Sequence, residues 1–207
     1  MRVLRLRPGD NICITNGNGS LWEARIAETG NTCSLEVYSY SLVPEEPEIH
    51  LAVGILQSSD RMEWMVEKLT ELGATRISLL SLQRCERKKV NTDRLRTVAI
   101  AALKQSGRAR LPEISGPVGF DQYLQSNLPD LRFAGYLPAE DAPDLSSCVS
   151  TPAPCTILIG PEGDLTPEEY RTAADQGFQA VRLGASVLRT ETAAMAACCL
   201  LRLGIRP

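Results

Sequence analysis

Three short segments near the C-terminal end of the chain combine glycine with charged side chains. They are Gly160-Pro161-Glu162-Gly163, Leu183-Gly184 and Leu188–Ala193, and the last carries Arg189 and Glu191. Glycines let the backbone approach a ligand closely and adopt conformations closed to other residues. An arginine can stabilise negative charge that develops on a substrate, and a nearby carboxylate can orient that arginine or accept a proton. These residue types therefore suit a ligand site with a charged catalytic pair.

Each of these features also has a purely structural interpretation. A glycine-rich loop can be no more than a tight turn from a strand into a helix. Arg189 and Glu191 stand at the mouth of an apolar helix, where a structural ion pair is common. Two charges at that position are costly unless they pair or take part in chemistry.

The elements that must position these segments follow the pattern of an α/β domain. Apolar runs and helical periodicity predict strands and helices in alternation. The strands are Ile49–Leu56, Arg76–Leu82, Arg132–Leu137, Thr156–Ile159 and Ala180–Gly184, and the helices are 60–73, Asn91–Ser106 and Ala193–Leu203. Such alternation predicts a largely parallel sheet. Ligands of open parallel sheets bind outside the carboxyl ends of the strands, where two of the glycine segments lie.

Two helices carry clear signals for where they begin or end. Asp60 is predicted to cap the first helix and Gly73 to end it. After the first glycine loop, Thr166 is predicted as an N-cap, with Pro167 at the first helical position and Glu169 completing a capping box. This last helix fixes the exit of the loop.

The N-terminal part of the chain has a different pattern. Short strands are predicted at Val3–Arg7, Asn11–Thr15, Leu21–Ile26 and Thr32–Tyr38. Asn16–Ser20 supplies residues that tolerate positive φ, as a hairpin requires, and the Pro/Glu cluster Pro44–Glu48 is typical of a linker. We therefore predict a small antiparallel sheet or barrel over residues 1–45 and an α/β domain over 46–207.

Charge is distributed unevenly along the chain. The whole protein carries a net charge of −3, but residues 84–110 hold nine Lys or Arg against two Asp or Glu, a local charge of +7. Lys and Arg gain free energy by displacing counterions from phosphates, so this segment indicates a polyanion partner such as RNA. The alternative is a solvated helix face with its loop.

Composition argues against several other classes of protein. No apolar run is long enough to cross a bilayer, and the N-terminus does not resemble a signal peptide, so we expect a soluble, cytoplasmic protein. The seven cysteines never occur as C-x-x-C and the single histidine is His50, which disfavours a zinc site or a Ser-His-Asp triad. No metal is expected. Neither G-x-x-x-x-G-K-[ST] nor G-x-G-x-x-G follows a strand, which disfavours a nucleotide-dependent enzyme.

The three glycine-bearing segments resemble the signature segments of the bacterial 16S ribosomal RNA (uracil-N3) methyltransferase family, a branch of the SPOUT superfamily. Further similarity lies upstream, at Arg61–Trp64, Lys68–Gly73, Gln105–Arg108 and Pro112. The resemblance covers nearly the whole chain, and Leu188–Ala193 is its most specific part. Relatives that methylate ribose typically have an Asn-rich final motif, which is absent here.

The sequence departs from the family pattern at two places. The second glycine usual after Gly-Pro-Glu-Gly is Asp164 here, and Asp tolerates left-handed conformations better than most residues. The N-terminal barrel also looks shortened, starting at what resembles the second strand of the family. The first departure concerns the cofactor loop, and the second concerns the domain that positions RNA.

The resemblance implies a parallel sheet with a C-terminal trefoil knot, preceded by a PUA-like β-barrel. It implies S-adenosyl-L-methionine as cofactor, a homodimer, and methylation of N3 of a uridine in 16S rRNA of the small ribosomal subunit. Carried onto this sequence, the cofactor-binding positions are Leu158, Gly160, Gly163, Leu183, Gly184 and Leu188.

The hypothesis for catalysis rests on Arg189 and Glu191. Arg189 would stabilise negative charge on a uracil oxygen or hold a phosphate, and Glu191 would orient Arg189 or accept the N3 proton. Candidate RNA-binding residues are Arg5, Arg7, Arg84, Arg87, Lys88, Lys89, Arg108 and Arg110. Two alternatives stay open: a non-catalytic RNA-binding protein with a degenerate cofactor site, and a SPOUT methyltransferase that acts on another RNA nucleotide.

Overall fold

The structure is a computed structural model that describes residues 6–30, 32–136, 141–149 and 153–204. The chain divides into two compact units. The first comprises residues 1–46 and 109–111, and the second comprises residues 47–108 and 112–207. The predicted RNA-positioning Arg5 lies outside the described residues.

The first unit is a small antiparallel sheet of strands in the order β1-β2-β3. The strands are β1 (Asn11–Thr15), β2 (Ser20–Thr29) and β3 (Cys33–Leu42). The hairpin between β1 and β2 is closed by Asn16, whose Oδ1 accepts hydrogen bonds from the backbone N–H groups of Asn18 and Ser20 at 2.8 and 3.3 Å. Gly17 and Gly19 have φ angles of 76° and 96° there, as the predicted hairpin requires.

Residues 109–111 complete this first unit. The backbone N–H of Gly19 donates to the Ala109 carbonyl at 2.9 Å, and that of Leu111 donates to the Gly17 carbonyl at 2.8 Å. Arg110 lies between them, half-buried, and its guanidinium packs against Gly19. The end of the basic segment 84–110 therefore serves as an extra edge for the N-terminal sheet.

The second unit contains a six-stranded sheet in the order β6-β5-β4-β8-β7-β9. Its strands are β4 (Ile49–Gly54), β5 (Arg76–Ser81), β6 (Glu113–Gly119), β7 (Leu131–Gly135), β8 (Cys155–Ile159) and β9 (Gln179–Val181). All of its pairings are parallel, which confirms the predicted parallel sheet. β4 and β8 are completely buried, as their continuous apolar sequences indicate.

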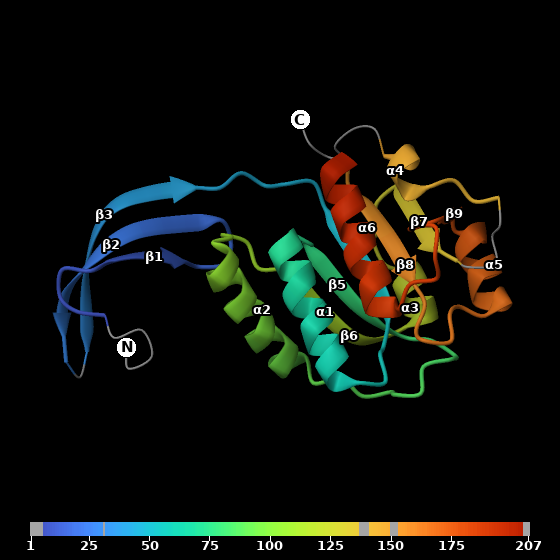
Figure 1. The fold of residues 1–207 in the computed structure, drawn as a ribbon, viewed down its shortest axis with the longest axis horizontal. Coiled ribbons are helices and arrows are strands. Elements are labelled where there is room, and N and C mark those ends of the chain that lie inside the picture. The colour runs from blue at the N-terminus through green and yellow to red at the C-terminus, as the bar shows by residue number, and fades with distance from the viewer. Residues whose placement is uncertain (1–5, 31, 137–140, 150–152, 205–207) are drawn as a thin grey trace. The chain divides into compact units, whose positions relative to one another are not determined.

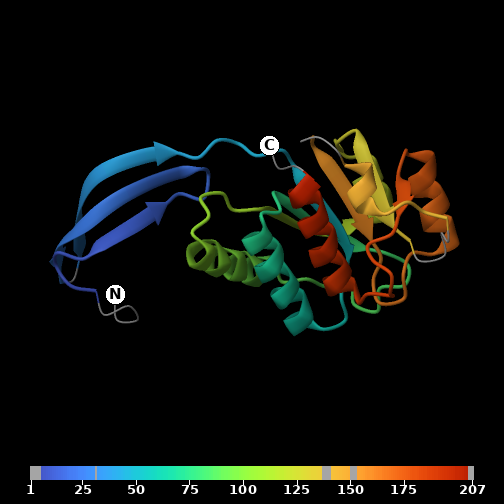
Figure 2. The same cartoon turned by 45° about the horizontal axis from the view of Figure 1, so that its top comes forward.

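Three long helices cover one face of this sheet, as Figures 1 and 2 show. They are α1 (Ser59–Leu72), α2 (Thr92–Ser106) and α6 (Thr190–Gly204), and α1 packs against both of the others. The shorter helices are α3 (Phe120–Leu124), α4 (Leu145–Cys148) and α5 (Pro167–Asp175). Because α6 also contacts β4 and β8, it lies over the central strands of the sheet.

The helix ends agree with the sequence signals except at one cap. Gly73 ends α1 with a φ of 90°, and Thr166 forms the predicted capping box with Glu169 at the start of α5. The predicted cap Asp60 is wrong. Ser58 caps α1 instead, its side chain accepting from the backbone N–H of Arg61, and Asp60 lies in the first turn. A serine suits this position equally well, and an acidic residue in the first turn is favoured by the helix dipole.

Two strand predictions need correction. The predicted strand Val3–Arg7 falls largely outside the described residues, and its last two residues have no regular structure. β6 was not anticipated, because Gly116 and Pro117 interrupt it. It lies at the edge of the sheet, where a proline costs no ladder hydrogen bond. The trefoil knot stays a prediction.

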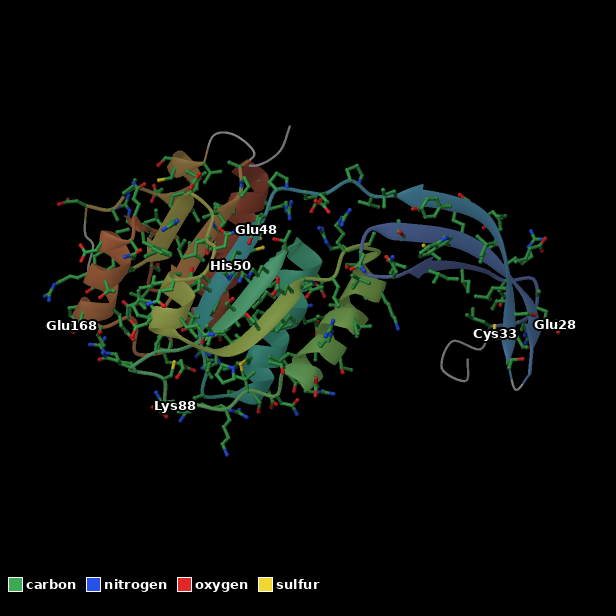
Figure 3. The ribbon with its side chains drawn as sticks, turned by 180° about the vertical axis from the view of Figure 1, so that it is seen from behind. Glu28, Cys33, Glu48, His50, Lys88 and Glu168 are labelled. Atoms are coloured by element: carbon green, nitrogen blue, oxygen red, sulfur yellow. The ribbon has the colours of Figure 1, made fainter. Side chains whose placement is uncertain are left out.

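His50, in β4, is a structural residue. It lies inside the sheet (Figure 3), fully buried, with Nε2 2.9 Å from Oγ of Ser78 and its ring edge-on to Tyr123. Burial, together with the positive charge of Arg76, lowers the pKa of His50 to about 3. The imidazole is therefore neutral at physiological pH.

Candidate active site

The loop after β8 is built around Gly160. The turn folds back so closely that a Cβ atom on Gly160 would lie 2.7 Å from the backbone nitrogen of Leu165. Asp164 closes the turn with a φ of 60°; its N–H donates to the Pro161 carbonyl at 2.9 Å, and its Oδ1 accepts from the Leu165 N–H at 2.8 Å. Asp164 thus has the left-handed conformation that Asp tolerates better than most residues.

Two side chains hold this loop in place from outside. Nη1 of Arg84 donates to the carbonyls of Gly163 and Leu165 at 2.6 and 3.2 Å. Glu169, the buried capping-box residue, accepts a further hydrogen bond from the backbone N–H of Gln83 at 2.8 Å. The segment after β5 is therefore fastened to the second half of the loop after β8 and to the start of α5.

A cavity of about 520 Å³ opens beside this loop, at the carboxyl ends of β7 and β8. It is lined by Arg61, Gly135, Ile159, Gly160, Pro161, Glu162, Asp164, Val187, Leu188, Arg189 and Thr190. A second cavity of about 250 Å³ shares Gly135, Val187 and Leu188 with the first and extends along Val181–Ser186. Sites for small molecules and cofactors typically measure about 300–1,000 Å³, so the pair offers room for one.

Most predicted cofactor-binding residues line these cavities. Gly160 and Leu188 line the larger one, and Leu183, Gly184 and again Leu188 line the smaller. Leu158 is buried within β8, and Gly163 packs against the Arg84 side chain. Neither Leu158 nor Gly163 is among the described residues that line the two cavities.

The charged residues of the larger cavity form a connected group. Arg61, on α1, holds both carboxylate oxygens of Glu191, with Nε to Oε1 at 2.9 Å and Nη2 to Oε2 at 2.5 Å. Its Nη1 is 3.2 Å from Oε1 of Glu162. The same Glu162 oxygen accepts from the backbone N–H of Gln57 at 3.1 Å. Arg61 thus links the start of α1, the glycine loop and the start of α6.

This arrangement corrects the hypothesis for Glu191. The carboxylate was expected to orient Arg189, but its partner is Arg61, 130 residues away in the chain. Burial acts to raise the pKa of Glu191, yet the hydrogen bonds and positive charge of Arg61 outweigh it and hold that pKa below its ordinary value. A carboxylate with a lowered pKa and both oxygens engaged is a poor proton acceptor.

Arg189 has a different environment. It is exposed, lines the larger cavity, and forms no side-chain hydrogen bond or ion pair within the part of the chain that the structure describes. Its guanidinium is therefore available to a ligand. Sequence reasoning did not assign a role to Arg61, although the segment Arg61–Trp64 is one of those that carry the family resemblance.

The predicted RNA-binding residues fall into two groups. Arg84 holds the glycine loop, Arg108 packs half-buried against Gly73, and Arg110 donates to the Val43 carbonyl at 2.8 Å. These three side chains therefore have a structural role within the protein, and their contact with RNA stays a prediction. Arg84 is exposed, as are Arg7 in the first unit and Lys88 and Lys89 beside the half-buried Arg87 on the loop after β5. Nζ of Lys88 also donates to the Leu82 carbonyl at 3.3 Å. Figure 3 shows Lys88 at the periphery of its unit.

Neither a membrane span nor a metal cluster is found in the described ranges. Within them, no helix has the length and apolar character needed to cross a membrane. The same residues contain no group of three or more His, Cys, Asp or Glu side chains placed to hold a metal ion.

Comparison with known proteins agrees with the cavity and the fold. The sequence model of an RNA methyltransferase domain matches residues 44–202, and that of an RNA methyltransferase PUA domain matches residues 1–38. These matches, which span most of the chain, identify it as an RNA methyltransferase.

The similar proteins are more specific. The ribosomal RNA small subunit methyltransferase E of Rickettsia conorii is 32% identical over 97% of this chain and 84% of that protein. A probable rRNA-methyltransferase from Porphyromonas gingivalis has a solved structure with a TM-score of 0.87 and 33% identity, covering 95% of this chain and 85% of that one. The chain belongs to the ribosomal RNA small subunit methyltransferase E family, which confirms the resemblance predicted from its motifs.

One solved relative also contains the predicted cofactor. The ribosomal RNA small subunit methyltransferase E of Neisseria gonorrhoeae, solved with bound S-adenosyl methionine, has a TM-score of 0.86 and 29% identity. The match covers 98% of this chain and 86% of that one.

Proposed function

We propose that this chain methylates N3 of a uridine in 16S rRNA of the small ribosomal subunit, using S-adenosylmethionine, as a cytoplasmic homodimer. The names of its relatives support the ribosomal substrate, and the Neisseria structure supports the cofactor. The observation that carries the proposal is the exposed, unpaired Arg189 in a cavity bordered by the glycine loop, among the residues that the structure describes.

The residues around the two cavities fit the cofactor. Gly160 allows the loop to fold tightly while leaving space beside β8, and Gly135 leaves room at the end of β7. Leu183, Val187 and Leu188 offer an apolar wall along the smaller cavity. When bound there, S-adenosylmethionine would supply an activated methyl group to a nucleophile held at the mouth of the larger cavity.

Arg189 then has a specific chemical task. Uracil N3 carries a proton and is a poor nucleophile while neutral, so the uracil anion must be favoured, with the N3 proton passing to water before N3 accepts the methyl group. A guanidinium close to a uracil oxygen favours the anionic form for the same reason that it lowers the pKa of a neighbouring carboxyl group. Arg189 is free to do this, and the ionised Glu191 is held away by Arg61. We therefore assign anion stabilisation to Arg189 and no proton transfer to Glu191.

RNA contacts are assigned to the basic side chains at the surface. The loop after β5 carries Arg87, Lys88 and Lys89. Arg84, in the same loop, holds the glycine loop that borders the cavity. Binding of RNA phosphates by these residues would therefore bring the RNA towards the cavity. In the described part of the first unit acidic residues outnumber basic ones, so Arg7 is the candidate contact there.

The proposal of a homodimer rests on the apolar character of α6 and of the segment that leads into it. Val187 is 75% exposed and Leu203 is 55% exposed, at opposite ends of a segment that is apolar on nearly every side. A second copy of the chain would cover these side chains.

The proposal is tested by incubating the purified protein with S-adenosylmethionine carrying a labelled methyl group and with small ribosomal subunits that lack the modification. We expect label in 16S rRNA with the wild type, and a loss of roughly 100-fold or more with Arg189→Ala, as when one preorganised charge-stabilising donor is removed. Calorimetry should show unchanged cofactor affinity for that variant. Absence of cofactor binding by the wild type would overturn the proposal and favour a non-catalytic RNA-binding protein.

A further inference from the structure

The guanidinium of Arg61 binds the carboxylates of Glu191, at the start of α6, and of Glu162, in the glycine loop. Its pair with Glu191 is bidentate, and the Glu191 side chain is only 8% exposed while that of Arg61 is 32% exposed. Bidentate pairs of arginine with a carboxylate are the most strongly oriented ion pairs in proteins. Glu191 is thereby fixed towards α1.

Arg189 stands two residues before Glu191 and would be the obvious alternative partner. Its positive charge contributes to the lowered pKa of Glu191, so the two groups are within electrostatic reach. Glu162, which also lines the larger cavity with Arg189, has its Oε1 engaged by Arg61 and by the backbone N–H of Gln57. Oδ1 of Asp164, a further acidic residue of this cavity, accepts from the Leu165 N–H at 2.8 Å. Glu191, Glu162 and Asp164 are thus all engaged, and Arg189 is left unpaired among the described residues.

We propose that Arg61 is a positioning residue that withholds Glu191 from Arg189, so that the Arg189 guanidinium stays available to the RNA substrate. This rests on the role proposed for Arg189 above. The role of Arg61 is exerted through the Glu191 carboxylate, which it holds at both oxygens, and requires no contact between Arg61 and the substrate. Without Arg61, the Glu191 carboxylate would neutralise the charge on Arg189.

The proposal predicts a reversal in a double variant. In Arg61→Met, Glu191 turns to Arg189 and turnover falls roughly five- to tenfold, the strength of one partly exposed ion pair. The change appears in kcat, with the affinity for S-adenosylmethionine preserved within about threefold, since Arg61 is not needed to form the apolar wall. In Arg61→Met/Glu191→Gln no carboxylate remains at position 191, and kcat recovers to within about twofold of Glu191→Gln alone. A structural role for Arg61 would make the double variant as poor as Arg61→Met or poorer.

A readout that needs no activity separates this inference from the proposed function. Phenylglyoxal modifies guanidinium groups, and a carboxylate pair protects them. Its rate at Arg189 can be measured by peptide mass spectrometry, with the exposed Arg96 of α2 as internal reference. We expect Arg189 to react fast in the wild type, roughly fivefold more slowly in Arg61→Met, and fast again in the double variant.

The outcomes are distinct. Equal Arg189 reactivity in the wild type and Arg61→Met overturns the positioning role, whether or not the protein methylates RNA. The predicted reactivity pattern in a protein that transfers no methyl group supports the positioning role and contradicts the proposed function. If Arg61→Met does not fold, Arg61→Lys keeps the charge but loses the bidentate geometry, and a smaller drop of about twofold at Arg189 is expected. If the reactivity of Arg189 in Arg61→Lys equals that in the wild type, the proposal is overturned as well.

Discussion

Arg84 and Gly163, 79 residues apart in the chain, are joined by a hydrogen bond of 2.6 Å from Nη1 to the carbonyl oxygen. The same nitrogen reaches the Leu165 carbonyl at 3.2 Å. Arg84 is the first residue of the basic segment, yet its guanidinium binds backbone carbonyls of the glycine loop. The cofactor loop and the segment that carries the surface lysines are therefore one connected structure.

Replacing Arg84 should affect the cofactor more than the RNA. In Arg84→Met the loop loses both hydrogen bonds, and we expect the dissociation constant for S-adenosylmethionine to rise about three- to tenfold, since Arg84 is largely exposed. Calorimetry measures this directly. The matched control is Arg96→Met, an exposed arginine on α2 remote from the loop, which should bind the cofactor as the wild type does. Equal affinities of the two variants would contradict the positioning of the loop by Arg84.

Lys88 and Lys89 should show the opposite behaviour. Removing both in Lys88→Ala/Lys89→Ala should weaken RNA binding and reduce the slope of log K against log salt by about one for each phosphate that is no longer bound. Cofactor affinity should not change, because both side chains are exposed on the loop after β5. Filter binding of small-subunit RNA at several salt concentrations is the measurement. A slope identical to that of the wild type would remove these lysines from the RNA surface.

Gly160 should tolerate no side chain. A Cβ atom there would lie 2.7 Å from the Leu165 nitrogen, so in Gly160→Ala the loop must shift, at a cost of about 1–3 kcal/mol. Thermal unfolding should show a lower Tm and calorimetry a loss of cofactor binding. Gly184→Ala is the control for stability, because a Cβ at Gly184 meets nothing within 4 Å. Equal Tm values for the two alanine variants would show that the turn is looser than described.

His50 should make the stability of the protein depend on pH. Its pKa is about 3 in the folded protein and 6.5 ordinarily, so between these values the unfolded chain binds a proton that the folded protein does not. Acidification through this window therefore lowers the free energy of unfolding, by up to about 1.4 kcal/mol per pH unit, while above pH 6.5 the contribution is complete.

The variant His50→Asn isolates this contribution, because it removes the titrating group and leaves an amide that can still bond to Ser78. Denaturant unfolding between pH 7 and pH 4 should show a shallower loss of stability for the variant than for the wild type. Parallel curves would mean that the imidazole is not held neutral by burial. The other titrating groups are common to both proteins and cancel in the comparison.

Periodicity and turn chemistry predicted most of the α/β unit. β4 and β8 are apolar throughout, and Thr166, Pro167 and Glu169 specify the start of α5 from local sequence alone. β6 escaped prediction because its Gly116-Pro117 pair resembles a turn, and only its place at the edge of the sheet makes the proline acceptable.

The site was harder to predict than the fold. The glycine loop and Arg189 could be found because local motifs carry them. The pair of Arg61 with Glu191 spans 130 residues, and no local pattern joins the two. A run of positive charge likewise does not tell which arginines are already engaged, as Arg84, Arg108 and Arg110 proved to be.

Methylation of uracil N3 in 16S rRNA with the help of Arg189 is tested most directly by mass spectrometry of nucleosides from small-subunit rRNA treated with the purified protein and S-adenosylmethionine. We expect one N3-methyluridine per 16S molecule with the wild type and none above background with Arg189→Ala. A methyl group on a ribose hydroxyl or on another base would exclude N3 of uracil as the target, and full activity of Arg189→Ala would remove Arg189 from catalysis.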